Sequence, residues 1–221
     1  MPFADGVEVV GVDGDDTLWL CQDAFDAAEA RLVELVGPGF AERLEEISRR
    51  NLRLYGYGVK AWTLNCLEAG GPLEEVLALG RELLSGPVEL LPGAAEAVDA
   101  LAAAHRVVLV TKGDLVDQRR KLAASGLADR FDHVEIVADK DVAAYQELLR
   151  FLDVPAERFL MVGNGEVSDV APVLAAGGWA VRVPHTTTWS LERATPTAHP
   201  RRAQVTSLGQ VPALLQGSLE G

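Results

Sequence analysis

Short, continuously apolar runs recur along the chain, and each is followed by a polar or glycine-containing turn and then by a segment with helical spacing. This alternation of strand and helix predicts an α/β fold built on a parallel sheet. Because the runs are apolar throughout, we expect strands that are covered by helices on both faces. The runs are Val7 to Val12, Arg106 to Val110, His133 to Val137, Phe159 to Val162 and Trp179 to Val183, with a weaker one near Ala203 to Val205.

One interval, between the first run and the second, interrupts this rhythm. Roughly ninety residues there show helical spacing without a convincing strand, which is far longer than an ordinary strand-to-helix connection. We therefore expect an inserted helical subdomain at residues 20–85, and a core made of residues 1–19 and 86–221. The helices of the insertion are expected at Asp23 to Val36, Phe40 to Leu54, Gly58 to Ala69 and Leu73 to Leu84.

The composition is that of an ordinary globular protein. With 221 residues, 48% of them hydrophobic and 24% charged, the chain can bury one large core, or a core with a smaller insertion. No apolar stretch is long enough for a membrane helix, and the first residues lack the basic-then-apolar order of a secretion signal, so we expect a cytoplasmic protein. Cys21 and Cys66 show no spacing typical of a disulfide framework or a zinc site.

The net charge of -13 narrows the choice of partners. Binding to a nucleic acid or to an anionic membrane requires many cationic groups at the interface, so we expect neither partner. A small anionic substrate remains compatible with this charge. It would need only a few lysines, backbone amides or a metal ion in one cleft.

Three carboxylates follow the first apolar run, in the segment Asp13-Gly14-Asp15-Asp16-Thr17. The carboxyl end of a buried strand is where ligands bind in open α/β sheets. Two carboxylates at positions i and i+2, Asp13 and Asp15, can hold a hard cation, and magnesium fits because it accepts one or two carboxylates together with substrate phosphate. A turn at Asp13-Gly14, with Asp16 or Thr17 capping the next helix, would explain the same residues without a function.

The next three runs also end in polar residues. The second ends in Thr111-Lys112-Gly113, whose hydroxyl and backbone amides could clamp a phosphate or simply cap a helix. After the third comes Lys140, which could neutralise a phosphate and a nucleophilic carboxylate, or be a solvated charge. After the fourth comes Asp169, a candidate metal ligand or helix cap. Because all four sets fall at the carboxyl ends of consecutive expected strands, together they indicate one site.

In this order of carboxylates, hydroxyl, lysine and carboxylate, the chain resembles the haloacid dehalogenase-like hydrolase superfamily over nearly its whole length. The segment from Asp13 to Thr17 is similar to its DxDxT motif, Thr111 to its second-motif hydroxyl, Lys140 to its third-motif lysine, and Gly163 to Asp169 to its acidic fourth motif. The insertion resembles the helical cap of the first subclass. The resemblance implies a Rossmann-like parallel sheet flanked by helices, with an inserted α-helical cap.

The resemblance also implies a magnesium-dependent phosphatase that works through an aspartyl-phosphate intermediate. Asp13 would attack phosphorus, and Asp15 would protonate the leaving alcohol and then activate water. Asp13, the backbone carbonyl of Asp15 and Asp169 would hold Mg²⁺. The groups expected to bind the transferring oxygens are Thr111, Lys140 and the amides near Gly113, with Lys112 either adding positive charge or pointing to solvent.

Two residues depart from the superfamily pattern. Asn164 stands where many members carry an acid, and Gly165 replaces a common serine or threonine. An amide can still bind a metal-held water, so we expect Asn164 to act through water, with weaker metal affinity. The name-giving dehalogenases of the superfamily use the same aspartate on a carbon–halogen bond without a metal. Asp15 favours phosphoryl transfer over that alternative, whereas an amide at position 164 is also typical of dehalogenases, and a non-catalytic relative of the fold is the third alternative.

The substrate is expected to be a small phosphorylated metabolite, such as a phosphate ester or sugar phosphate, because a helical cap of this size encloses small molecules. Tyr55, Tyr57, Lys60 and Trp62 could face the cleft, or pack between helices with an exposed lysine. The polar stretch from His185 to Trp189 could line the entrance. We expect a monomer or a homodimer.

Overall fold

The computed structural model describes residues 3–196 and 198–218. In this part of the chain, all strands of the main sheet are parallel, in the order β3-β2-β1-β4-β5-β6. The α/β fold with a Rossmann-like sheet is therefore confirmed. The strands are β1 (Val9–Val12), β2 (Arg106–Lys112), β3 (His133–Val137), β4 (Phe159–Gly163), β5 (Trp179–Arg182) and β6 (Arg202–Gln204).

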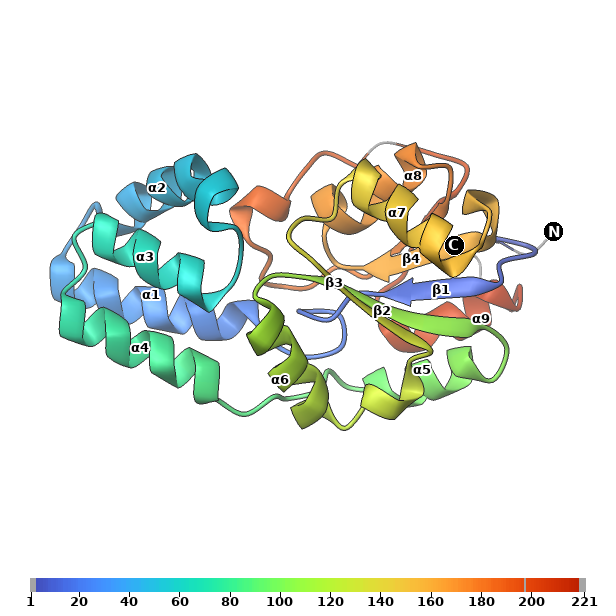
Figure 1. Cartoon of the computed structure of the whole chain (residues 1–221), viewed down its shortest axis with the longest axis horizontal. Coiled ribbons are helices and arrows are strands. Elements are labelled where there is room, and N and C mark those ends of the chain that lie inside the picture. Colours follow the sequence, from blue (N-terminus) through green and yellow to red (C-terminus); the bar gives the residue numbers. More distant parts are fainter. Residues whose placement is uncertain (1–2, 197, 219–221) are drawn as a thin grey trace.

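Helices cover both faces of the sheet, as the continuously apolar strands predict (Figure 1). Val10 and Val12 of β1 pack on one face with apolar residues of α5, α6 and α9, whereas Val9 packs on the other face with α7 and α8. All three valines are fully buried. The helices are α5 (Ala94–Ala102), α6 (Leu115–Ser125), α7 (Val142–Leu152), α8 (Ala171–Ala175) and α9 (Val211–Leu215).

Of the helices between β1 and β2, the first four form a separate group at one end of the sheet (Figure 1). They have their own hydrophobic cluster, centred on the fully buried Leu32, Phe40 and Val76. We call this group the helical insertion. Its helices are α1 (Gln22–Val36), α2 (Phe40–Tyr55), α3 (Val59–Glu68) and α4 (Leu73–Ser85), each beginning and ending within one residue of the expected bounds.

Two adjacent backbone connections join the insertion to the sheet. The Leu20 N–H donates to the carbonyl of Glu89, and the Leu91 N–H donates to the carbonyl of Leu18. The chain thus leaves and re-enters the core at one place.

The expected outer limits of the core, residues 1 and 221, lie outside the described residues. No helix among the described residues is long and apolar enough to cross a membrane.

β1 is the strand that positions the site. It lies at the centre of the sheet, and successive strands are added on one side as β2 and β3 and on the other as β4, β5 and β6. The chain therefore changes direction next to β1, and a crevice opens at the carboxyl end of a strand at such a point. The residues that follow β1 begin with Asp13.

Candidate active site

The turn after β1 holds its carboxylates in fixed positions. The N–H groups of Thr17, Leu18 and Trp19 all lie within hydrogen-bonding distance of the Gly14 carbonyl. Asp16 has a φ of 58°, in the left-handed region, and its carboxylate accepts hydrogen bonds from the N–H of Cys21 at 2.8 Å and of Gln22 at 3.1 Å. Asp16 therefore caps the start of α1, as the structural alternative for this residue predicts. Asp13 and Asp15 are not used in this way.

Asp13 lies against a buried lysine. The Lys140 ammonium contacts Asp13 Oδ1 at 2.5 Å and Asp169 Oδ1 at 2.7 Å, and all three side chains are buried. The second oxygen of Asp169 accepts a hydrogen bond from the Gly165 N–H at 2.8 Å. Burial raises the pKa of Asp13 to about 8, Asp169 adds to the increase, and Lys140 opposes it. Two carboxylates thus share one lysine, which balances the charge of only one of them when both are ionised.

Asp15 has a different environment. Its Oδ1 accepts from Trp19 Nε1 at 2.6 Å and from Lys121 Nζ at 2.8 Å, while its Oδ2 accepts from Gln118 Nε2 at 2.8 Å. Burial by itself would raise the pKa of Asp15, but Lys121, Gln118 and Trp19 outweigh burial and hold the pKa below its usual value. Asp15 is therefore ionised at neutral pH in this arrangement.

Gln118 and Lys121 were not among the residues expected from the sequence. They lie three positions apart on α6, the helix that begins just after Thr111, so they share one face of that helix. The sequence signal that could have identified them is an amide and a lysine three positions apart in the segment that follows the second motif. Both side chains line the cavity.

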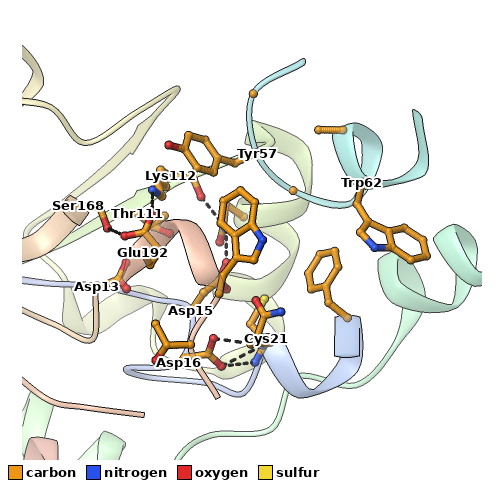
Figure 2. A pocket seen from close by; sticks show the side chains of 18 of the residues that line it. Asp13, Asp15, Asp16, Cys21, Tyr57, Trp62, Thr111, Lys112, Ser168 and Glu192 are labelled. Atoms are coloured by element: carbon orange, nitrogen blue, oxygen red, sulfur yellow. Dashed lines mark hydrogen bonds and ion pairs between the residues drawn. The ribbon is translucent and has the colours of Figure 1, made fainter. Parts of the chain in front are cut away.

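An unexpected carboxylate, Glu192, enters the cavity from the segment after β5. Glu192 accepts a hydrogen bond from Ser168 Oγ at 2.7 Å and forms an ion pair with Lys112, whose ammonium also lies 3.8 Å from the ring centre of Tyr57 (Figure 2). A Cβ atom at Gly165 would come within 2.7 Å of the Glu192 carboxylate. The glycine that departs from the superfamily pattern thus leaves room for Glu192. The sequence signal was the polar stretch just before it.

The residues of the second motif have different surroundings in the structure. The Thr111 side chain is almost fully buried and lines the cavity. The Gly113 N–H, in contrast, donates to the Val137 carbonyl at 3.1 Å and continues the β2–β3 ladder. This amide is not free to bind a phosphate, so the geometry does not support the predicted role of Gly113. Asp114 accepts from the N–H groups of Val116 and Asp117 and caps α6, as the alternative for this segment predicts.

One cavity of about 160 Å³ connects these groups with the helical insertion. Of the insertion residues named from the sequence, Tyr57 and Trp62 line it, whereas Tyr55 donates to Glu68 and Lys60 pairs with Asp114. Asp169 forms an ion pair with Lys140 and does not line the cavity. The sequence-predicted residues that do line it are Asp13, Asp15, Thr111, Lys112, Lys140 and Asn164, and the polar stretch after β5 adds Thr188 and Trp189.

The donor set can be compared with the needs of Mg²⁺. The described residues contain no group of three or more acidic, histidine or cysteine side chains arranged around a common point. They do offer the hard oxygen ligands that Mg²⁺ prefers, from Asp13 and from the amide of Asn164, which forms no side-chain hydrogen bond with a described residue. The cavity lining contains five carboxylates (Asp13, Asp15, Asp16, Glu29 and Glu192) and three lysines (Lys112, Lys121 and Lys140), an excess of two negative charges when all are ionised. A divalent cation beside a phosphate fits both the ligand chemistry and this excess.

A family model and a solved structure place the chain in the same protein family. A family model described as haloacid dehalogenase-like hydrolase matches residues 7–177. A solved structure of a hydrolase from the same family, from Xanthomonas campestris, is 38% identical in sequence, with a TM-score of 0.85, and the match covers 98% of this chain and 95% of that one. No curated protein sequence matches the chain.

Two further solved structures are similar. A 2-haloacid dehalogenase from Pseudomonas syringae pv. tomato is 25% identical, with a TM-score of 0.60, and the match covers 95% of this chain and 98% of that one. A hydrolase from Bacillus subtilis, whose structure is described as bound to magnesium, is 19% identical, with a TM-score of 0.68 and the same two coverages, 95% and 98%. At that identity the second likeness shows the fold alone.

Proposed function

This chain belongs to the haloacid dehalogenase-like hydrolase family, and from that premise we propose that it is a magnesium-dependent phosphatase acting on a small phosphate ester through an aspartyl-phosphate intermediate. The observation that carries the proposal is the second carboxylate. Asp15 lies in the same cavity as Asp13 and is held there by three donors. Release of an alcohol from phosphorus is aided by a proton donor, whereas displacement of a halide from carbon releases an anion that needs no proton.

Asp13 is the nucleophile in this proposal. One of its oxygens forms a bond to phosphorus as the bond from phosphorus to the leaving oxygen breaks. Lys140 lies 2.5 Å from Asp13 Oδ1 and favours the charged form of the carboxylate. The same ammonium and the Thr111 hydroxyl are in position to bind oxygens of the phosphoryl group, since both line the cavity beside Asp13.

Asp15 acts next. As a carboxylate it takes a proton from the water that attacks phosphorus and frees Asp13. Its role as an acid in the first step requires prior uptake of a proton, which the contacts with Lys121, Gln118 and Trp19 oppose. Esters of acidic alcohols such as p-nitrophenol, which leave without protonation, are therefore the best first substrates.

Mg²⁺ would be held by Asp13 and the backbone carbonyl of Asp15, with Asn164 acting through a bound water, and would supply positive charge and alignment for the phosphoryl group. Asp169 would join these ligands only after turning from Lys140 and from the Gly165 N–H, which engage its two oxygens here. The excess of two negative charges in the cavity lining supports this choice of ion.

A 2-haloacid dehalogenase is the alternative, and two observations favour it: the amide at Asn164 and the similarity to the Pseudomonas syringae enzyme. The two functions differ in their products. We expect phosphate release from p-nitrophenyl phosphate that requires magnesium, and no chloride release from 2-chloropropionate with or without metal. Chloride release without metal, together with absent phosphate release, would establish the alternative.

The assay includes two variants. Asp13→Asn removes the proposed nucleophile and serves as the blank, while Asp129→Asn removes an exposed carboxylate far from the cavity and serves as the matched control. Turnover that survives unchanged in Asp13→Asn contradicts the proposal. Absence of turnover on a broad panel of phosphorylated metabolites with magnesium would favour a non-catalytic protein.

A further inference from the structure

The cavity does not end at the catalytic residues but continues into the helical insertion. On α1 the lining residues are Gln22, Phe25 and Glu29, at the spacing of one helical face. The insertion side of the cavity is completed by α2 and α3, and Figure 2 shows Trp62 of α3 there, at the opposite side of the cavity from Asp13. The lining residues of these two helices are Ser48, Leu52, Ala61, Trp62 and Asn65.

Glu29 is the unusual group at that end. Its Oε1 accepts a hydrogen bond from Trp62 Nε1 at 3.0 Å, which fixes the direction of the carboxylate. Among the described residues no lysine, arginine or histidine forms an ion pair with Glu29, and its second oxygen accepts no hydrogen bond. The charged groups that influence it are Asp26 and Glu45, which are also acidic. A partly buried carboxylate without a counter-ion is unfavourable unless a ligand supplies one.

The surroundings of Glu29 are suited to a cation. The rings of Phe25 and Trp62 meet edge to face, with their centres 6.0 Å apart, beside the carboxylate. Aromatic faces attract ammonium groups, and the attraction increases when water is excluded. Asn65 also lines the cavity, but its side-chain oxygen accepts a hydrogen bond from Asn51 at 3.0 Å and is thus used within the insertion.

We propose that this end of the cavity, formed by Phe25, Glu29 and Trp62, binds an ammonium group carried by the leaving alcohol, so that the substrate is a phosphate ester of an amino alcohol. The inference rests on the proposed phosphatase function for the ester, but the ammonium site stands on the unpaired carboxylate and the aromatic pair. A carboxylate at the same position of the substrate would meet Glu29, Asp26 and Glu45 and be repelled.

The geometry also indicates the length of the alcohol. Gln22 and Glu29, which both line the cavity, are seven residues apart on α1, so about 10 Å of helix lies between them. An extended chain advances roughly 1.2 Å per bond. An aminohexyl phosphate reaches about that far from phosphorus to nitrogen, whereas an aminoethyl phosphate reaches about half of it.

The test uses the full chain and two readouts. The first is binding of hexylammonium, compared with hexanol, by calorimetric or NMR titration. The second is kcat/KM for aminohexyl phosphate, compared with hexyl phosphate, in the presence of magnesium. We expect the ammonium compound to be preferred by about 10- to 100-fold in each pair, the range of one charge-assisted hydrogen bond.

Two variants assign the preference to the site. Glu29→Gln keeps the size and the Trp62 contact but removes the charge, and the preference should fall to about onefold. Glu34→Gln, at an exposed position of the same helix, should keep the preference of the unmodified protein. Comparable thermal unfolding midpoints of the two variants show that any difference is local.

The inference is overturned if hexylammonium and hexanol bind equally well, or if Glu29→Gln retains the preference. If no phosphate ester is hydrolysed while hexylammonium binding still depends on Glu29, the ammonium site is supported and the phosphatase proposal fails. The two failures are therefore separable.

Discussion

The two ends of the cavity differ in how their charges are compensated. At the sheet end, Asp13 and Asp169 share Lys140, and Asp15 is paired with Lys121. At the insertion end, Glu29 accepts a hydrogen bond from the indole N–H of Trp62 and forms no ion pair with a described residue. A carboxylate that is paired with a lysine of the protein keeps its position and charge during a reaction cycle. A carboxylate without such a partner can instead be neutralised by a cationic group of a ligand. The comparison assigns reaction to the sheet and recognition to the insertion.

Removal of the nucleophile should have the largest effect. Asp13→Asn is expected to lower kcat for p-nitrophenyl phosphate by at least about a thousandfold, because the covalent step is lost. Steady-state phosphate release measures this change, with Asp129→Asn as the control. A loss of less than about tenfold would place the chemistry on another residue.

The next largest effect is expected from removal of Lys140, because this lysine is the counter-ion of Asp13 and Asp169 at the sheet end. Lys140→Met leaves Asp13 and Asp169 buried without their cation, and we expect it to lower the free energy of unfolding by about 3–5 kcal/mol. Denaturant unfolding measures this effect.

Lys60→Met provides the contrast for that experiment, since its ion pair with Asp114 is more than half exposed on the lysine side. It should cost less than about 1 kcal/mol. Equal effects of the two variants would mean that the buried carboxylates are already neutral, and would contradict the proposed role of Lys140.

A smaller effect is expected when Asp15 loses its partner. Lys121→Met should reduce kcat by about 10- to 100-fold, part of what a positioned proton-transfer group contributes. If Lys121 acts through Asp15, the change should have little further effect in an Asp15→Asn background. A double-mutant cycle measures this coupling, and independent, multiplying losses would contradict it.

At the insertion end, the pH dependence of the substrate preference tests the role of Glu29. Burial raises the pKa of Glu29, while the Trp62 hydrogen bond opposes the increase and Asp26 and Glu45 add to it. Glu29 therefore loses its charge at a higher pH than an ordinary glutamate as the solution is acidified. The preference for aminohexyl over hexyl phosphate should be full at neutral pH and decline as pH falls through that raised pKa.

The ratio of the two kcat/KM values measures this pH effect, because titrations at the sheet end affect both esters alike. The same pH profile for Glu29→Gln should be flat. A preference that does not change with pH in the unmodified protein would contradict an ionised Glu29 as its source.

The sheet end was largely predictable from the sequence. Carboxyl ends of parallel strands meet at one edge, so Asp13, Thr111 and Lys140 had to lie together once the apolar runs were taken as strands. The Gly113 amide failed as a prediction because β2 continues to Lys112, beyond the apolar run, and the ladder with β3 uses this N–H group.

The remaining site residues depend on long-range packing that spacing does not specify. The rotation of α6 brings Lys121 to Asp15, 106 residues away in the sequence. The loop after β5 folds back so that Glu192 reaches Lys112, 80 residues away. The apolar and polar spacing of α1 predicts a common face for Phe25 and Glu29, but only the packing of the insertion leaves a cavity in front of them.

The most direct test of the central claim is an acid quench within the first turnover of radiolabelled p-nitrophenyl phosphate with magnesium. The account predicts label in the peptide that contains Asp13, released by hydroxylamine as expected of an acyl phosphate, and no label in Asp13→Asn. A burst of nitrophenol without bound label, or label on another residue, would contradict Asp13 as the nucleophile.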